Sequence, residues 1–407
     1  MQKSQVYDES KVKTLSSIEH IRLRTGMYIG RLGDGSHPDD GIYVLFKEVL
    51  DNAIDEFIMG YGKRIKVKCN STFMSVRDYG RGIPLGKLVE CVSQINTGAK
   101  YNTDVFMFSV GLNGIGIKAV NALSENFKVA AYRDGKYREV VYSRGEIQDD
   151  TKGKTSKRDG TFVEFIPDRE IFGNFTFHED FLQDRCQHYA HLNAGLKIQM
   201  NGESFFSEAG LRDLLNDEAG ESAMYPPVFF RDKILEFSLT HTTDFGERYL
   251  SFANGQYTSS GGTHLSAFKE GITKAINSYT GEIYSGQDVR EGIIAAISIR
   301  LKEPVFESQT KTRLGNNDIR GWIVNMIKTE LEQHLHKNPD TASILVNKVI
   351  MNKKIRTELS NVRKKAKQRA KNVVLRIPSL KDCKIHYGDE SKRSEETTIF
   401  LTEGASA

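Results

Sequence analysis

The sequence predicts an α/β sandwich followed by a second α/β domain. The first observation is an amphipathic helical pattern over residues 42–59, followed by segments in which apolar and polar residues alternate, as in the strands of a mixed sheet. The second is a change of order near residues 223–227, beyond which strands alternate with long helices. A length of 407 residues fits two or three domains.

The first domain is expected to begin with an arm that ends in the segment GMYIG. The helix over residues 42–59 follows, and a polar, glycine-rich stretch over residues 98–116 leads into a helix near residues 117–123. Helices on one face of the sheet and strands behind them give the layers of a sandwich. The strands are predicted at residues 65–69, in the segment that runs into Asp78, and at residues 128–132, 139–142 and 161–166.

The second domain is expected to alternate strands with helices and to end in one long helix. The last dozen residues, ETTIFLTEGASA, are expected to form an apolar strand and an acidic turn, so that the chain stops inside a third domain. The predicted domains are residues 1–222, 223–390 and 391–407. The strands of the second domain are predicted at residues 234–239, 249–254 and 293–300, and its helices at residues 263–275, 317–335 and 341–371.

Composition indicates a globular protein of the cytoplasm. The net charge is only +4, so the chain as a whole is not strongly basic. No segment reaches the roughly 18 apolar residues that a membrane span needs, and the N-terminus has no apolar signal segment. The four cysteines lie far apart, which argues against a zinc cluster or a disulfide framework. They are Cys69, Cys91, Cys186 and Cys383.

The helix over residues 42–59 is the first segment with chemical meaning. Glu48, Asn52 and Asp55 recur at i, i+4 and i+7 and therefore share one face of this helix. A carboxylate can polarise a water for attack on a γ-phosphate, and an amide oxygen can complete a Mg²⁺ shell. Taken alone, the pattern is more typical of an ordinary solvated face. The opposite stripe is apolar and is formed by Ile42, Phe46, Val49, Ala53 and Phe57.

Two further segments add to this pattern. Asp78 ends a strand and opens the turn DYGRGIP, where a carboxylate can accept from an exocyclic amine such as adenine N6 and the glycines allow the backbone to approach a planar base. The glycine-rich segment over residues 111–116 precedes a helix, whose first N–H groups favour an anion such as phosphate. Each segment alone also fits a plain turn, and neither a P-loop nor a Rossmann spacing is present.

Together, these segments resemble the GHKL (Bergerat) ATPase fold shared by type II topoisomerases, Hsp90, MutL and histidine kinases. Within it the resemblance is to the ATPase subunit of bacterial type IIA DNA topoisomerases, that is, gyrase B and its topoisomerase IV counterpart, and extends over nearly the whole chain. The matching segments are YDES, GMYIG, EVLDNAID, DYGRGIP, NTGAKY, VGLNGIGIKAVNALS, DGT, SGGTHL, EPVFESQTKTRLG and LTEG. The resemblance implies an α+β chain: a GHKL ATPase domain, a transducer domain similar to ribosomal protein S5 domain 2, and the start of a TOPRIM domain.

The resemblance also implies roles for individual residues, with ATP and Mg²⁺ as cofactors. Glu48 is the expected general base, Asn52 the Mg²⁺ ligand and Asp78 the adenine-binding carboxylate, supported by the Thr161 hydroxyl. Lys311, in the QTK triplet with Gln309, is expected to reach the γ-phosphate from the transducer. The remaining nucleotide contacts are expected from Tyr7 on the arm of a second copy, from the pocket residues Asp55, Gly80, Gly82, Ile83 and Pro84, and from the lid residues Lys100, Gly111, Leu112, Asn113, Gly114, Ile115 and Gly116.

The chain departs from the family pattern at its end. Glu403 fits an acidic ligand of the TOPRIM metal site, but Ala405 stands where the family has aspartate, so that site is incomplete. The resemblance implies an ATP-driven clamp (N-gate) that forms a homodimer on ATP binding, captures a DNA duplex for strand passage, and works with the DNA-cleaving tyrosine subunit in an A₂B₂ heterotetramer without membrane contact. This chain alone is expected to hydrolyse ATP and not to cleave DNA.

Three hypotheses of function remain open at the level of sequence. The stretches HKNPDTASILVNK and SFANGQ and the lack of long insertions favour a topoisomerase IV-like protein over gyrase B. A second hypothesis is another GHKL ATPase of Hsp90 or MutL type, which the QTK and GGTHL segments count against. A third is a non-catalytic DNA-binding scaffold, suggested by the basic residues of the long helix and opposed by an intact Glu48.

Overall fold

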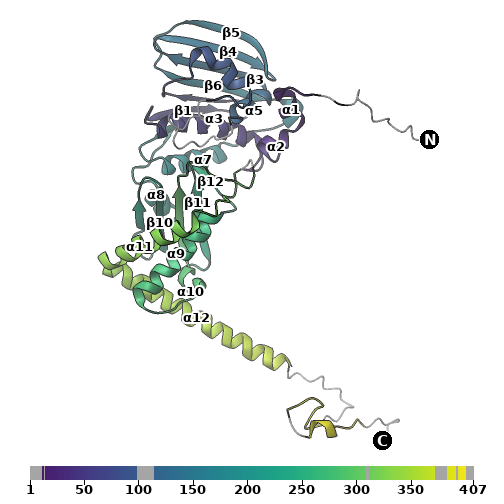
Figure 1. Ribbon diagram of the computed structural model, residues 1–407, viewed down its shortest axis with the longest axis vertical. Helices are drawn as coiled ribbons and strands as arrows, with labels where there is room; N and C mark the ends of the chain where they lie inside the picture. The colour runs from purple at the N-terminus through teal and green to yellow at the C-terminus, as the bar shows by residue number, and fades with distance from the viewer. Residues whose placement is uncertain are drawn as a thin grey trace, which may run out of the picture. The chain divides into compact units, whose positions relative to one another are not determined.

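The computed structural model describes residue 12 and residues 14–98, 114–308, 311–371, 383–390 and 393–399. Residues 1–352 form one compact unit, and residues 353–407 are assigned to a second. The first unit contains two separate β-sheets, each with its own helices (Figure 1). The predicted order, an α/β sheet with its helices followed by a second such sheet with its helices, is therefore correct. The predicted domain boundaries stay predictions.

The first sheet is mixed, as the sequence predicts. Among the described residues it has eight strands in the order β5-β4-β3-β6-β2-β1-β7-β8. Only β1 and β7 are parallel neighbours, and the other neighbours are antiparallel. The strands are β1 (Arg64–Cys69), β2 (Met74–Asp78), β3 (Ser124–Arg133), β4 (Lys136–Ser143), β5 (Glu146–Lys154), β6 (Gly160–Pro167), β7 (Lys197–Met200) and β8 (Glu203–Phe205).

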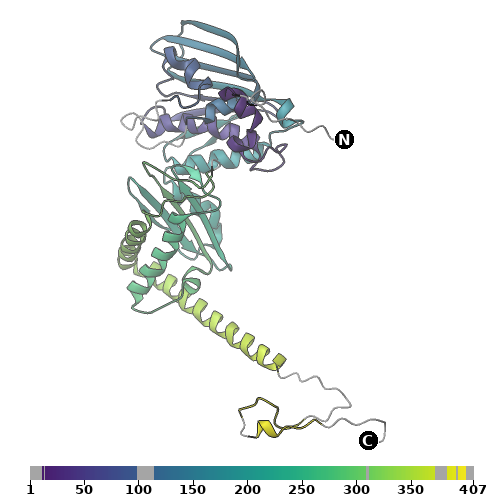
Figure 2. The ribbon, with the colours of Figure 1, turned by 45° about the vertical axis from the view of Figure 1, so that its right-hand side comes forward.

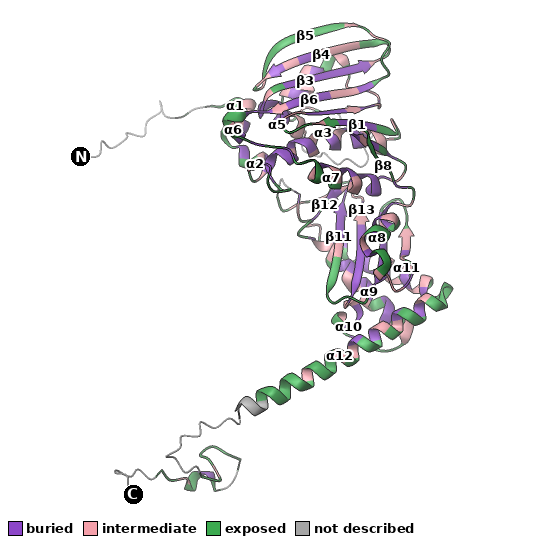
Figure 3. Ribbon diagram, turned by 180° about the vertical axis from the view of Figure 1, so that it is seen from behind, coloured by how far each residue is buried: buried purple, intermediate pink, exposed green. Residues whose placement is uncertain are grey.

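Helices cover one face of this sheet. Helix α3 (Gly41–Ile58) packs against β2 and β6, and α5 (Gly116–Ala122) packs against α3, β3 and β6. The apolar stripe predicted for α3 is buried except for Phe57, which is half-buried, and burial of this stripe holds the helix on the sheet (Figure 3). The other helices of this part are α1 (Ser17–Leu23), α2 (Thr25–Ile29), α4 (Leu88–Ser93), α6 (Arg169–Phe172) and α7 (Glu179–Leu192).

The second sheet has five strands among the described residues, in the order β12-β11-β13-β10-β9, with β11 and β13 parallel. Figure 2 shows this sheet and its helices from another side. Helices α9 and α11 pack closely, since a Cβ at Gly271 would lie 2.9 Å from Ile327. The elements are α8 (Leu211–Ala219), β9 (Val228–Arg231), β10 (Leu235–His241), β11 (Glu247–Ala253), β12 (Gln256–Tyr257), α9 (Thr263–Thr280), α10 (Gly286–Arg290), β13 (Ile293–Ile299) and α11 (Arg320–Lys337).

The long helix α12 (Pro339–Lys371) agrees with the predicted helix over residues 341–371. Its first half buries Ala342, Leu345 and Val349, whereas residues 361–367 are all exposed (Figure 3). Near the C-terminal end, the described residues 393–399 contain a 3₁₀ turn (Ser394–Glu396) and no strand. The rest of the strand expected there lies outside the described residues. No helix of the described residues is long and apolar enough to cross a membrane.

Candidate active site

The carboxylate of Glu48, the predicted general base, lies on helix α3 in close contact with the start of α5. Glu48 is half-buried, and its Oε2 lies so close to Gly116 that a Cβ there would be 1.7 Å away. Asn52 is one turn further along α3, and its Nδ2 donates to the carbonyl oxygen of Glu48 at 2.8 Å. Asp55 is almost completely buried. The polar face of α3 is therefore not an ordinary solvated face, because Glu48 lies against the start of α5, Asn52 is half-buried and Asp55 is buried.

Asp78 ends β2 and is held by two backbone groups. Its Oδ1 accepts from the N–H of Gly80 at 2.9 Å and from the N–H of Thr161 at 3.1 Å. Burial raises the pKa of Asp78 to about 6, although these two hydrogen bonds act in the opposite direction. The structure thus brings Thr161 to Asp78 through its backbone, and the role expected for its hydroxyl stays a prediction. Because Oδ1 of this buried carboxyl already accepts two hydrogen bonds, Oδ2 is suited to accept from one further donor.

The turn after Asp78 is fixed by close backbone contacts. Gly82 has φ +74°, and a Cβ there would lie 2.5 Å from the carbonyl oxygen of Tyr132, so only glycine fits. Arg81 pairs with Glu56 of α3 at 2.9 Å, a contact that the sequence analysis did not foresee. These contacts fasten the turn both to α3 and to the neighbouring strands. Ile83 and Pro84 follow in the same turn, half-buried and exposed respectively.

The glycine-rich segment is described only from Gly114 onward. Gly114 has φ +58°, Ile115 precedes the first residue of α5, and Gly116 begins that helix beside Glu48. The other residues expected at the nucleotide lie outside the described residues, as does the expected TOPRIM ligand. They are Tyr7, Lys100, Gly111, Leu112, Asn113, Gln309 and Glu403.

Lys311 belongs to the second sheet's part of the chain. It lies in the segment between β13 and α11, has φ +57°, and is only 3% exposed. The pKa of Lys47 on α3 is lowered to about 8, chiefly by burial. The positive charge of Lys311 lowers this pKa further, whereas the negative charge of Asp51 raises it. Lys311 therefore adds positive charge to the surroundings of Lys47, the residue that precedes Glu48 on α3.

Four residues that no sequence pattern singled out meet beside the turn of α3 that contains Glu48, and we name them the junction cluster: Lys47, Asp51, Tyr189 and Gln256. Asp51 is completely buried, and burial raises the pKa of its carboxyl. It accepts hydrogen bonds from the hydroxyl of Tyr189 and from Nε2 of Gln256, the latter at 2.8 Å, and Lys47 Nζ lies 3.9 Å from it. Only the i, i+4 pair of Lys47 and Asp51 was visible in the sequence.

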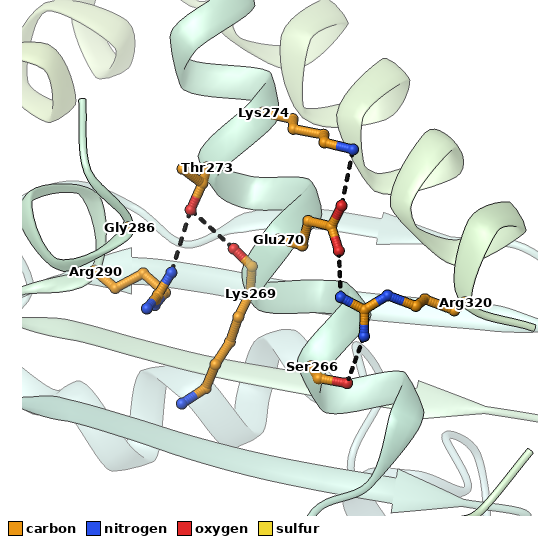
Figure 4. A pocket seen from close by; sticks show the side chains of 8 residues that line it. All are labelled: Ser266, Lys269, Glu270, Thr273, Lys274, Gly286, Arg290 and Arg320. Atoms are coloured by element: carbon orange, nitrogen blue, oxygen red, sulfur yellow. Dashed lines mark hydrogen bonds and ion pairs between the residues drawn. The ribbon is translucent and has the colours of Figure 1, made fainter. Parts of the chain in front are cut away.

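A hollow on the second sheet's helices is separate from this site (Figure 4). Its four cationic side chains are each paired with a carboxylate, so it shows a set of surface ion pairs, and we assign no ligand to it. The pairs are Lys274 and Arg320 with Glu270, at 2.8 and 2.6 Å, and Lys269 and Arg290 with Glu247, at 3.0 and 3.2 Å.

Comparison with known proteins identifies the class of this fold. Residues 38–171 match the family described as histidine kinase-, DNA gyrase B-, and HSP90-like ATPase, and residues 192–366 match the DNA gyrase B family. The fold resembles the 43K ATPase domain of Thermus thermophilus gyrase B, solved with an aminocoumarin, at a TM-score of 0.68 and 30% identity over 85% of this chain and 97% of that one. The fold and the site thus define a GHKL ATPase.

Relatives of known sequence define the family more narrowly. The B subunit of DNA topoisomerase 4 from Borreliella burgdorferi is 55% identical over 100% of this chain and 68% of its own length. The B subunit of DNA gyrase from Clostridium acetobutylicum is 33% identical over 100% of this chain and 67% of its own length. The chain belongs to the family of gyrase B and topoisomerase IV B proteins, the ATP-hydrolysing subunits of type IIA DNA topoisomerases. The topoisomerase IV-like prediction agrees with the higher identity, and the alternative of an Hsp90- or MutL-type ATPase is excluded.

Proposed function

We propose that Glu48 is the general base of ATP hydrolysis and that Lys311 binds the γ-phosphate. The observation that supports this most directly is the position of the Glu48 carboxylate, against Gly116 at the start of α5 and one turn from Asn52. Unpaired N–H groups at a helix start favour phosphate, and a carboxylate beside them can orient and deprotonate the attacking water. Lys311 acts electrostatically on Lys47, the neighbour of Glu48 in the chain, and would add a positive charge where negative charge develops.

The adenine base is proposed to lie against Asp78. Oδ1 of Asp78 is occupied by two backbone N–H groups, so Oδ2 is the oxygen that accepts from the adenine amine. Gly80 and Gly82 form the adjoining turn, where side chains would meet Glu56 and the backbone of Tyr132. This geometry supports selection of a base that presents a donor at this position.

Asn52 is the residue proposed to hold Mg²⁺ together with ATP. Its Nδ2 donates to the Glu48 carbonyl, and with the amide in this orientation its oxygen is the atom that would bind the metal. Among the described residues, no three histidine, cysteine or carboxylate side chains converge as a metal site, so most of the ligands would be phosphate oxygens and waters, as Mg²⁺ prefers. When bound, the ion neutralises phosphate charge.

The partners proposed for the chain are a second copy, duplex DNA and the DNA-cleaving tyrosine subunit, in an A₂B₂ assembly. ATP is proposed to favour a homodimer that captures the duplex for strand passage, with Tyr7 reaching the nucleotide of the second copy and Glu403 contributing to a metal site of a TOPRIM domain. The part of α12 beyond residue 352 supports DNA contact, because its basic residues greatly outnumber its single acid, Glu358. The basic residues are Lys353, Lys354, Arg356, Arg363, Lys364, Lys365, Lys367, Arg369 and Lys371.

The test of the proposed chemistry is ATP hydrolysis by this chain beside its Glu48→Ala variant, with Mg²⁺ present. We expect turnover in the first, a loss of at least a hundredfold in the second, and equal affinity for a non-hydrolysable ATP analogue, since general base catalysis contributes about 10²–10⁴-fold. Glu208→Ala, which removes an exposed glutamate, serves as the matched control and should leave turnover unchanged. Normal turnover in Glu48→Ala would remove Glu48 as the base.

A further inference from the structure

The junction cluster joins the two sheets of the first unit at one carboxylate. Tyr189 belongs to α7, beside the first sheet, whereas Gln256 belongs to β12, at the edge of the second. Both donate to Asp51 of α3, which is completely buried. A hydrogen bond between Asp51 and Gln256 therefore connects the helix that contains Glu48 to the second sheet.

Asp51 is the acceptor in this connection, and its neighbours are hydrogen-bond donors or a cation. A buried carboxylate is costly unless donors surround it, and Asp51 has Tyr189, Gln256 and, at 3.9 Å, the ammonium of Lys47. Gln256 is 1% exposed, and its Oε1 has no hydrogen-bond partner in the described part of the chain. The bond to Asp51 is thus the one described hydrogen bond of the Gln256 side chain, and it compensates for burying the amide.

Gln256 is also tied to Lys311 through the backbone. The segment that follows β12 is hydrogen-bonded to the segment that follows Lys311, because Ser260 N donates to Thr312 O at 3.0 Å and Leu314 N donates to Gly261 O at 3.2 Å. A displacement of Gln256 therefore displaces the segment of Lys311. Asp51 lies one turn from Glu48 on α3, so its bond with Gln256 links the helix of Glu48 to the segment of Lys311.

We propose that Asp51 is a positioning residue for ATP hydrolysis: through its hydrogen bond with Gln256 it holds Lys311 at the distance from Glu48 that the chemical step requires. This inference rests on the proposed roles of Glu48 and Lys311. Asp51 does not need to touch the nucleotide. Because a small misplacement of a catalytic group is costly in rate, loss of the bond affects kcat more than nucleotide affinity.

The first test is the Gln256→Ala variant of the whole 407-residue chain. We expect kcat for ATP hydrolysis to fall about tenfold or more, as for loss of a hydrogen bond to a charged group, with less than about a twofold change in affinity for a non-hydrolysable ATP analogue. Ser259→Ala, an exposed change in the same segment, is the matched control and should behave as the original chain. An unchanged kcat in Gln256→Ala, with or without a lower unfolding temperature, would overturn the proposal.

A second test separates positioning from mere structural support. Gln256→Glu places two carboxylates against each other and should lower kcat further than Gln256→Ala. Adding Asp51→Asn restores the pairing of one amide with one carboxylate, because the amide is now at position 51 and the carboxylate at position 256. The amide oxygen introduced at position 51 can still accept a hydrogen bond from Tyr189. We expect the double variant to recover at least about fivefold in kcat over Gln256→Glu. No recovery in a double variant that folds and binds the analogue would contradict the proposal.

Kinetic measurements distinguish a failure of the proposed hydrolysis from a failure of the role of Asp51. If the original chain with Mg²⁺ shows no more turnover than Glu48→Ala, the proposed hydrolysis at this site is wrong, whatever the junction cluster does. If the original chain hydrolyses ATP and depends on Glu48, but Gln256→Ala matches it in kcat, only the role of Asp51 is wrong.

Discussion

The proposed adenine contact can be tested by changing one oxygen of Asp78 to an amide. Asp78→Asn keeps the size of the side chain and the Oδ1 atom that accepts from the N–H groups of Gly80 and Thr161. It replaces Oδ2 with an N–H₂ group, which meets the adenine amine donor to donor. The fold around the turn should therefore persist while the contact with the base is lost.

The magnitude follows from the kind of bond removed. A hydrogen bond to a charged group contributes about 1.5–3 kcal/mol, and each 1.4 kcal/mol is a factor of ten in affinity. Because Asp78 is 6% exposed, water does not replace the lost partner, and the upper part of this range applies. We expect ATP-analogue affinity to fall about 40- to 150-fold. A GTP analogue, whose O6 accepts where adenine donates, should lose far less, so the preference for adenine should shrink.

The assay is calorimetric titration of the original chain and Asp78→Asn with non-hydrolysable ATP and GTP analogues at a pH of about 7.5, well above the pKa of Asp78. Thermal unfolding of both proteins shows whether the variant is folded. An ATP-analogue affinity within twofold of the original, in a folded variant, would refute the placement of adenine at Asp78. An equal loss for both analogues would show that the carboxyl supports the pocket without reading the base.

Four further predictions concern other parts of the molecule. The pKa of Asp78 without nucleotide is about 6, above its ordinary value of 3.8, so the carboxyl becomes protonated below pH 6. The affinity of the original chain for an ATP analogue, measured as a ratio to that of Asp78→Asn, should therefore fall by up to about tenfold per pH unit below 6. Because the pKa of Asp78 is raised in the folded state, this group stabilises the fold less as pH rises between about 4 and 6, so acid unfolding caused by Asp78 does not explain the loss. Gly116→Ala should displace the Glu48 carboxylate and lower kcat at least about tenfold in a folded protein, and an unchanged kcat would argue against the observed placement. Leu331→Ala, fully buried on α11, should reduce the free energy of unfolding by about 2–5 kcal/mol in urea titration, against less than about 0.5 kcal/mol for the exposed Leu359→Ala. A non-hydrolysable ATP analogue should raise the dimer fraction in sedimentation, and a persistent monomer would contradict the clamp.

Much of the fold was predictable because it depends on local periodicity. The apolar spacing along α3 and the length of α12 were readable from the sequence, and both helices end within a few residues of the prediction. Strand β5 was missed because nearly all of its side chains are exposed and show no alternation; it forms because its backbone pairs with β4. Strands β7 and β8 are too short to give a clear pattern.

The chemical groups of the site can be predicted from the sequence: a carboxylate and an amide one turn apart on a helix, a carboxylate at a strand end, and glycines before a second helix. Short spacings suffice for these, because neighbouring residues on one element keep fixed distances. The pKa values of these groups, and the contacts that they make with distant residues, depend on the tertiary structure. The raised pKa of Asp78 comes from burial by other elements, and Asp51 meets Tyr189 and Gln256 from 138 and 205 residues away. No spacing along the chain encodes such contacts, since they depend on how the parts of the chain that form two different sheets pack against one helix.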